Sequence, residues 1–101
     1  MKLITKTLIN RFKQIGDQSE NENPIFIAKF FDSIGSGTWY ASEYNPETNI
    51  CYGYVTGLAF DEWGTFSITE LESILGPFGK RIERDIYFSE IIYKDLINEI
   101  G

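Results

Sequence analysis

The sequence has no histidine and a single cysteine, Cys51, among its 101 residues. Histidine is the side chain that most often carries protons near neutral pH, so its absence removes the commonest general acid or base. One cysteine cannot form an internal disulfide or build a cysteine-based zinc site alone. Buried in a strand, its thiol would be inert. We therefore expect a binding protein that is not an enzyme and needs no cofactor.

Long hydrophobic runs are also missing. No segment has the roughly 20 consecutive apolar residues that a membrane-spanning helix needs. The first residues, Met1 to Lys6, are not followed by the apolar stretch of a secretory signal. A lone cysteine suits a reducing compartment. We expect a cytoplasmic protein that has no membrane partner.

Basic residues are scarce in the middle of the chain. Residues 14–79 hold ten acidic side chains and a single basic one, Lys29, and the whole chain carries a net charge of −6. Such a surface repels the phosphates of nucleic acid, which argues against direct binding to DNA or RNA. It permits binding to a basic protein surface, although a net charge of this size also serves ordinary solubility.

The length predicts one domain, residues 1–101, and a hydrophobic content of 43% is enough for a core without disulfides. Capping signals and apolar periodicity predict helices over Lys6–Ile15, from Ser67 to about Leu75, and Glu90–Ile100. Strands are predicted over Ile25–Phe31, Thr38–Tyr44, Ile50–Thr56, Trp63–Ser67 and Arg81–Phe88. This order predicts an α+β fold, in which an antiparallel sheet of four or five strands carries short N-terminal, middle and C-terminal helices.

Several separated motifs resemble a bacterial family catalogued as domain of unknown function 2958. They are Leu3-Ile4-Thr5-Lys6, Gly35-Ser36-Gly37-Thr38-Trp39-Tyr40, Tyr52-Gly53-Tyr54-Val55, Glu62-Trp63-Gly64-Thr65-Phe66-Ser67 and Pro77-Phe78-Gly79 through Phe88. The resemblance covers nearly the whole chain. It implies a small cytoplasmic protein of the kind often carried by plasmids, phages and integrated elements, and it implies no catalytic residues.

Two sets of residues are candidates for partner binding. Exposed carboxylates on one side of the molecule could imitate nucleic acid phosphates and occupy a basic channel. Tyrosines could supply apolar anchors, because Tyr52 and Tyr54 share one face of a strand and Tyr40 and Tyr44 can lie beside them across the hairpin. We expect both tryptophans to be buried. The candidates are Glu43, Glu47, Asp61, Glu62, Tyr40, Tyr44, Tyr52 and Tyr54.

Arg84 falls in an apolar row with Ile82, Ile86 and Phe88 if residues 81–88 form a strand. A half-buried arginine needs a carboxylate partner, and Glu62 or Glu70 could supply it. The alternative is an anion site at Arg84. A divalent cation would need oxygen ligands such as Asp61, Glu62 and Glu70, but no metal-binding loop is complete, so we expect no metal site.

Taken together, the sequence predicts an acidic protein-binding module of a mobile genetic element, either a monomer or a homodimer. The partner would be a protein with a basic surface, such as a CRISPR effector or a restriction nuclease that the module inhibits by blocking its nucleic-acid-binding surface. Two alternatives stay open. One is an accessory factor for plasmid or phage replication or transfer, and the other is a small ligand-binding protein or enzyme using Arg84 with nearby carboxylates.

Overall fold

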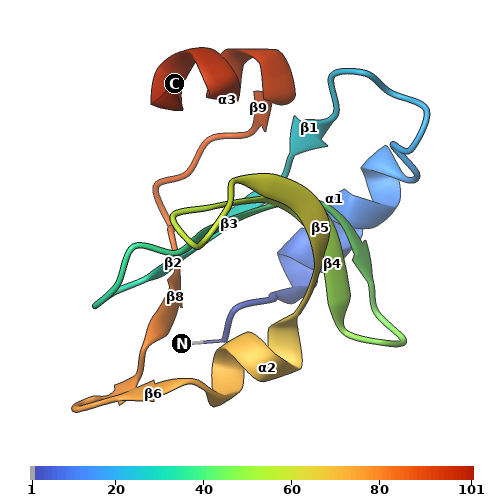
Figure 1. The fold of residues 1–101 in the computed structure, drawn as a ribbon. Helices are drawn as coiled ribbons and strands as arrows, with labels where there is room; N and C mark the ends of the chain where they lie inside the picture. Colours follow the sequence, from blue (N-terminus) through green and yellow to red (C-terminus); the bar gives the residue numbers. More distant parts are fainter. Residues whose placement is uncertain (1) are drawn as a thin grey trace.

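The computed structural model describes residues 2–101, and its largest sheet is antiparallel and five-stranded (Figure 1). In chain order the elements are α1 (Lys6–Ile15), β1 (Ile25–Phe26), β2 (Ala28–Asp32), β3 (Thr38–Asn45), β4 (Ile50–Thr56), β5 (Glu62–Ser67), α2 (Ile68–Ser73), β6 (Leu75–Gly76), β7 (Gly79–Lys80), β8 (Ile82–Arg84), β9 (Ile91–Ile92) and α3 (Tyr93–Ile100). The main sheet has the strand order β5-β4-β3-β2-β8, and all neighbours are antiparallel. The α+β prediction for a single domain is confirmed.

Local signals determine where α1 begins and ends. The Thr5 hydroxyl oxygen accepts a hydrogen bond from the Leu8 backbone N–H at 3.2 Å, which satisfies one of the free donors of the first turn. Gly16 ends the helix with φ of 73°, a conformation that glycine adopts without strain, and its N–H bonds to the Phe12 carbonyl. The predicted bounds of this helix are confirmed.

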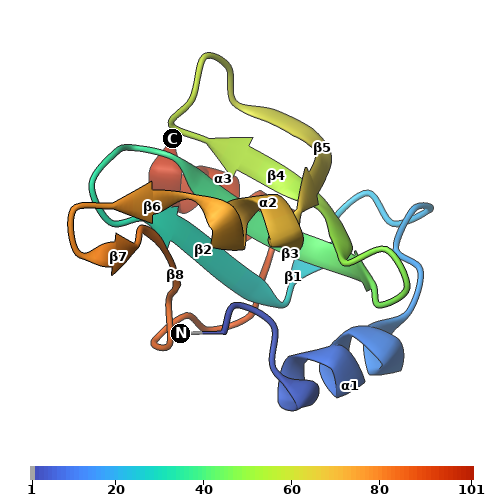
Figure 2. The same ribbon diagram turned by 90° about the horizontal axis from the view of Figure 1, so that it is seen from below.

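The helices lie on opposite faces of the sheet. Figure 2 shows α1 and α2 in front of the sheet and α3 behind it. On the α1 and α2 side, Phe12 and Leu71 pack with Phe30 and Trp39 of the sheet in the larger apolar core. On the α3 side a smaller core gathers mainly aromatic side chains. Its members are Phe26, Tyr40 and Leu96, with Tyr54, Trp63, Phe88, Ile91 and Tyr93 packed against them.

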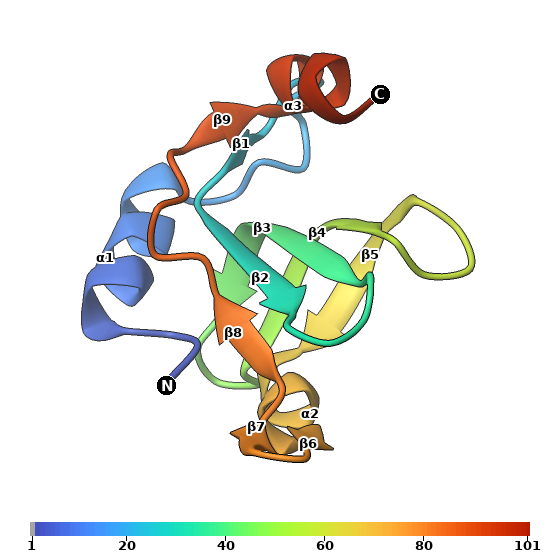
Figure 3. The same cartoon turned by 90° about the vertical axis from the view of Figure 1, so that its left-hand side faces the viewer.

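The predicted strand Ile25–Phe31 is divided in two. β1 leaves the main sheet and pairs with β9, while β2 pairs with β3 and β8. Residue 27 lies between them, and its backbone N–H bonds to the Ala41 carbonyl at 2.8 Å. The division lets β1 and β9 extend toward α3, beyond the main sheet (Figure 3). β1 is held by β9, which is distant in sequence, so no local signal marks the break.

The C-terminal third differs most from the prediction. The strand expected over Arg81–Phe88 ends at Arg84, because the Asp85 carboxylate accepts the Tyr87 backbone N–H at 2.9 Å and turns the chain. The last helix begins at Tyr93 and not at Glu90, because the two β-branched residues before it pair with β1 as a strand. Ser89 therefore caps no helix.

Candidate functional site

A β-bulge in β3 shapes the most distinctive surface of the molecule. Ala41 lies opposite Gly53 and Glu43 lies opposite Tyr52, so Ser42 is an extra residue in β3. The buried Ser42 hydroxyl donates to the Tyr52 carbonyl at 3.1 Å and holds the irregularity in place. As a result Glu43 shares the α3-side face of the sheet with Tyr52.

The same bulge separates the four candidate tyrosines. Tyr52 and Tyr54 share the α3-side face as predicted, and Tyr40 lies opposite Tyr54, although it is buried. Tyr44 does not join them, because the extra residue reverses the alternation of the strand. It points to the larger core, where its ring packs against Phe12 with centroids 5.7 Å apart. Tyr52 is the most exposed of the four, at 41%.

Tyr52 is the outer member of an aromatic stack. Its ring lies nearly parallel to that of Trp63, at 17° with centroids 5.7 Å apart. Trp63 also stacks on Phe26, with centroids 5.4 Å apart. Trp63 is half-buried, so our expectation of a buried tryptophan is correct for Trp39 only. Glu43 lies opposite Tyr52, the exposed end of this stack.

Two open hollows flank this Glu43–Tyr52 pair. One has a volume of about 230 Å³ and lies between the pair and the loop after α1. The other, of about 270 Å³, runs toward the β3–β4 turn. The first is lined by Gln18, Ser19, Pro24, Ser42, Glu43, Tyr52 and Trp63, and the second by Glu43, Tyr44, Asn45, Thr48, Ile50, Cys51, Tyr52 and Thr65. A ligand side chain on either side would meet both the carboxylate and the ring.

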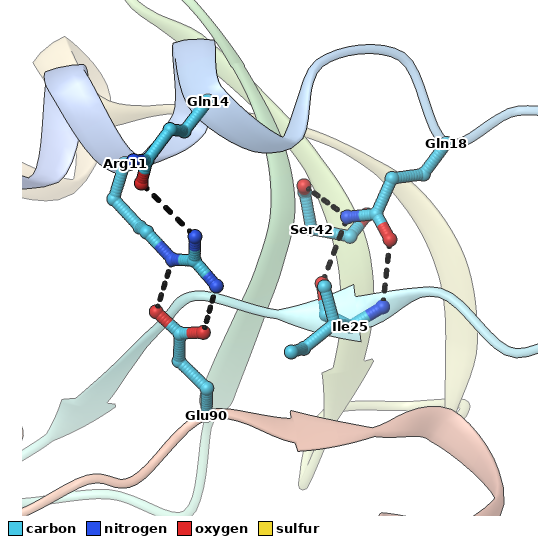
Figure 4. A network of polar contacts seen from close by, with 6 residues as sticks. All are labelled: Arg11, Gln14, Gln18, Ile25, Ser42 and Glu90. Atoms are coloured by element: carbon cyan, nitrogen blue, oxygen red, sulfur yellow. Dashed lines mark hydrogen bonds and ion pairs between the residues drawn. The ribbon is translucent and has the colours of Figure 1, made fainter.

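The buried Gln18 amide lines the first hollow, and Figure 4 shows its hydrogen bonds to Ile25 and Ser42. Its Nε2 donates to the carbonyls of Ile25 at 2.9 Å and Ser42 at 2.8 Å, and its Oε1 accepts the Ile25 N–H at 2.7 Å. These bonds tie the loop after α1 to both β1 and the bulge. The Gln18 amide and the backbone groups that it contacts are therefore already hydrogen-bonded to each other.

The charged form of the Glu43 side chain is disfavoured at this position. Burial raises the pKa of its carboxyl, the charge of Asp17 raises that pKa further, and a hydrogen bond from the Gln18 backbone opposes the rise. A carboxylate kept where its charged form is disfavoured is typical of functional sites, because an incoming cation can compensate it.

The remaining acidic candidates do not form one line with Glu43. Glu47 is exposed in the β3–β4 turn. Asp61 and Glu62 lie at the other end of the sheet. The β3–β4 turn ends at Ile50, which pairs with Ser67 at the end of β5, and Glu62 is five residues back along that strand. Five residues of strand span about 16 Å. These acids therefore do not form a continuous phosphate-like row, and Glu43 is the one that lies opposite Tyr52.

Arg84 and its expected partners are placed apart. Arg84 is on β8 and Glu62 on β5, the two opposite edges of the main sheet, so they do not form the predicted pair. The Arg84 Nη1 donates to the carbonyls of Lys2 at 2.7 Å and Leu3 at 3.3 Å. Glu70 is exposed on α2, where its backbone N–H bonds to the capping Ser67. Arg84 thus holds the N-terminal segment against the sheet.

Some residues of the site had no signal in the sequence. Gln18 lies in a polar stretch that reads as an ordinary loop, and Ser42 reads as one more position of a regular strand. Both acquire their role from contacts with distant backbone groups. An alternation in β3 that breaks after Ala41 could have indicated the bulge, but small and polar residues there leave the pattern ambiguous.

Residues 2–101 contain no cluster of three acidic or cysteine side chains arranged to hold a metal ion. Asp61, Glu62 and Glu70 are accordingly not gathered into one group. The Cys51 thiol is buried, and its burial raises its pKa above the ordinary value. None of the helices described between residues 2 and 101 has the length and apolar character required to cross a bilayer.

Comparison with known proteins places the chain in a family. Neither the curated proteins nor the solved structures include a match to it. A family described as a protein of unknown function, DUF2958, matches residues 3–93. The matched range includes the bulge in β3 and the aromatic stack. The chain belongs to the DUF2958 family.

Proposed function

We propose that this protein is a non-enzymatic binding module that docks on a basic surface of a partner protein. The observation that carries this proposal is the position of Glu43, half-buried beside the stacked ring of Tyr52 and between two hollows. Tyr52 and Trp63 form the aromatic part of the contact surface. Other acidic groups, such as Glu47, steer the partner and do not anchor it.

The chemistry of this surface suits the guanidinium group of an arginine. The negative face of an aromatic ring attracts a cation, and a carboxylate accepts two parallel N–H bonds from a guanidinium. Glu43 beside Tyr52 offers both contacts to one side chain. The arriving positive charge would also lower the raised pKa of the Glu43 carboxyl, so binding and ionisation support each other.

The narrower proposal is that the partner is a host defence nuclease, such as a CRISPR effector or a restriction nuclease. The basic channel of such an enzyme would take up the acidic module, which would block access of nucleic acid. The net charge of −6 supports this idea, because it favours a basic target and opposes contact with nucleic acid itself.

A charge-matched pair of variants tests the site. Glu43→Gln and Glu47→Gln each remove one negative charge near the β3–β4 turn, but only Glu43 adjoins Tyr52. We expect Glu43→Gln to weaken binding of an acetylated arginine-rich hexapeptide about tenfold in calorimetry, whereas Glu47→Gln changes it less than about twofold. Equal losses in both variants would mean that the peptide senses only overall charge, and would overturn the proposal.

The nuclease proposal needs its own measurement. Cleavage of a labelled DNA substrate by purified CRISPR effectors and restriction nucleases is followed with increasing amounts of the protein. Inhibition that weakens with added salt and is lost in Glu43→Gln would support it. If no nuclease in such a panel is inhibited while the peptide still binds, the partner belongs to another class of basic protein.

A further inference from the structure

The β5 edge of the main sheet offers a second binding surface, separate from Glu43. β5 pairs with β4 from Val55–Glu62 to Ile50–Ser67, and no other strand among residues 2–101 pairs with it. Figure 3 shows β5 at one side of the sheet and β8 at the other. An edge strand directs alternate backbone N–H and C=O groups outward, where another extended chain can pair with them.

Gly64 lies in the middle of this edge strand, opposite Gly53. Gly53 is required by packing, because a Cβ there would come within 1.8 Å of the Tyr40 carbonyl oxygen. Neither packing nor backbone conformation requires glycine at position 64. A Cβ there would meet no atom within 4 Å, and the φ of Gly64 is not positive. Glycine inside a strand weakens it and often marks a place where a ligand or a second backbone approaches closely.

An apolar groove of about 330 Å³ begins at Gly64. Trp39, Val55 and Phe66 form its sheet side, on the same face as Gly64. The β4–β5 loop lines it as well, and the loop residues Leu58 and Phe60 are 57% and 75% exposed. Apolar side chains this exposed around a groove mark an interaction site more often than a solvated surface.

The charges around the groove indicate the occupant. Glu62 lines its rim and is exposed, on the same face as Gly64 and two residues away. An extended segment laid along β5 would place a side chain over Gly64 and the next side chain of that face beside Glu62. A basic residue there would be complementary. A second copy of this chain fits less well, because both molecules would carry a net charge of −6.

We propose that β5 accepts an extended segment of a partner protein as an added strand. An apolar side chain of the segment enters the groove over Gly64, and a basic side chain two positions away meets Glu62. The backbone hydrogen bonds align the segment, and the groove and the carboxylate select its sequence. This surface does not depend on Glu43, which lies two strands away on the opposite face.

Gly64→Leu is the sharpest test, because it places an apolar side chain in the groove at a position where a Cβ meets no atom within 4 Å. The probe is the peptide acetyl-Thr-Lys-Thr-Leu-Thr-Val-Thr-amide, and binding is followed by NMR shifts and amide exchange at residues 62–67. We expect Gly64→Leu to weaken binding at least about tenfold, while its melting temperature stays equal or rises. Thr7→Leu, at an exposed position of α1 outside the groove, is the control and should bind normally.

Two further arms make the result decisive. Leu58→Ser changes an exposed loop residue, so folding is preserved, and it should weaken the same peptide several-fold. N-methylating one alternate set of peptide amides should abolish binding and the other set should not, since only one set faces β5.

Unchanged affinity in Gly64→Leu and Leu58→Ser, or equal effects of both N-methylated sets, would overturn strand addition. A dimer of the unmodified protein that Gly64→Leu abolishes would assign the edge to a second copy and would equally overturn it. Glu43→Gln should bind this peptide normally, so failure here leaves the Glu43 proposal standing, and the reverse also holds.

Discussion

At the scale of single residues, Glu43 shows how the proposed binding role can oppose stability. Burial and the Asp17 charge raise the pKa of its carboxyl above the ordinary value. The folded state therefore binds this proton more tightly than the unfolded chain does, and the resulting stability is fully present below the unfolded pKa of about 4.3 and lost as pH rises through the folded pKa. At neutral pH the ionised Glu43 disfavours folding slightly.

We accordingly predict that Glu43→Gln is at least as stable as the unmodified protein at pH 7, by up to about 0.5 kcal/mol. The advantage should disappear near pH 3, where both side chains are neutral. Urea denaturation at the two pH values measures this. A marked loss of stability at pH 7 would show that the carboxylate is needed for the fold, and would weaken its assignment to partner binding.

At the scale of elements, the bulge depends on a side chain from outside the sheet. The Gln18 amide bonds to both backbone groups of Ile25 and to the Ser42 carbonyl, so one residue of a loop aligns β1 with the irregular part of β3. Gln14, four residues earlier and within α1, instead accepts an exposed hydrogen bond from the Arg11 Nη1 at 3.0 Å (Figure 4). We therefore expect the two glutamines to contribute differently to the free energy of unfolding.

Gln18→Ala should cost about 1–3 kcal/mol, because it leaves buried backbone groups without their partner. Gln14→Ala is the matched control and should change the free energy of unfolding by less than about 0.5 kcal/mol. Thermal denaturation gives both values, and amide exchange at Ile25 should speed up only in the first variant. Equal small effects would mean that the loop position is held by other contacts.

At the scale of the whole molecule, ion pairs connect parts of the chain that are far apart in sequence. Arg81 Nε donates to Asp32 Oδ1 at 2.7 Å and joins the end of β2 to the segment before β8. Arg11 and Glu90 join α1 to the segment before β9 at 2.8 Å, but both are exposed enough for solvent to screen them. Asp32 is the better protected carboxylate, with its side chain 12% exposed.

The Asp32–Arg81 pair predicts a component of acid denaturation. The hydrogen bond from Arg81 holds the pKa of the Asp32 carboxyl well below its usual range. Stability from this group is thus present above the unfolded pKa of about 3.9 and is lost as pH falls through the folded value. Asp32→Asn should lose about 1–2 kcal/mol at pH 7 and show a shallower decline below pH 4. Asp95→Asn, at an exposed site of α3, should decline like the unmodified protein.

Much of the fold could be predicted because its signals are local. Thr5 and Gly16 set the bounds of α1, Ser67 starts α2, and the turn around Pro46 sets the β3–β4 hairpin. The predicted face shared by Tyr52 and Tyr54 is present for the same reason, since β4 is regular. These features depend on neighbours within a few residues, which a single sequence displays.

The parts that could not be predicted depend on partners distant in the chain. The division of the strand at residue 27 and the start of α3 at Tyr93 both follow from the pairing of β1 with β9. The site shows the same limit. One extra residue at Ser42 decided that Glu43 adjoins Tyr52 and that Tyr44 enters the core, because alternation along a strand is lost at a bulge.

The sequence by itself determined the composition of the surface and the local elements: an acidic, histidine-free α+β chain rich in aromatic residues. Only the tertiary structure decided which acid lies beside which ring, and which glycine has open space beside it. The reason is physical. Charge and helix caps are properties of single residues and short segments. Whether a hollow forms, and which strand edge stays unpaired, depends on how separate parts of the chain are arranged in space.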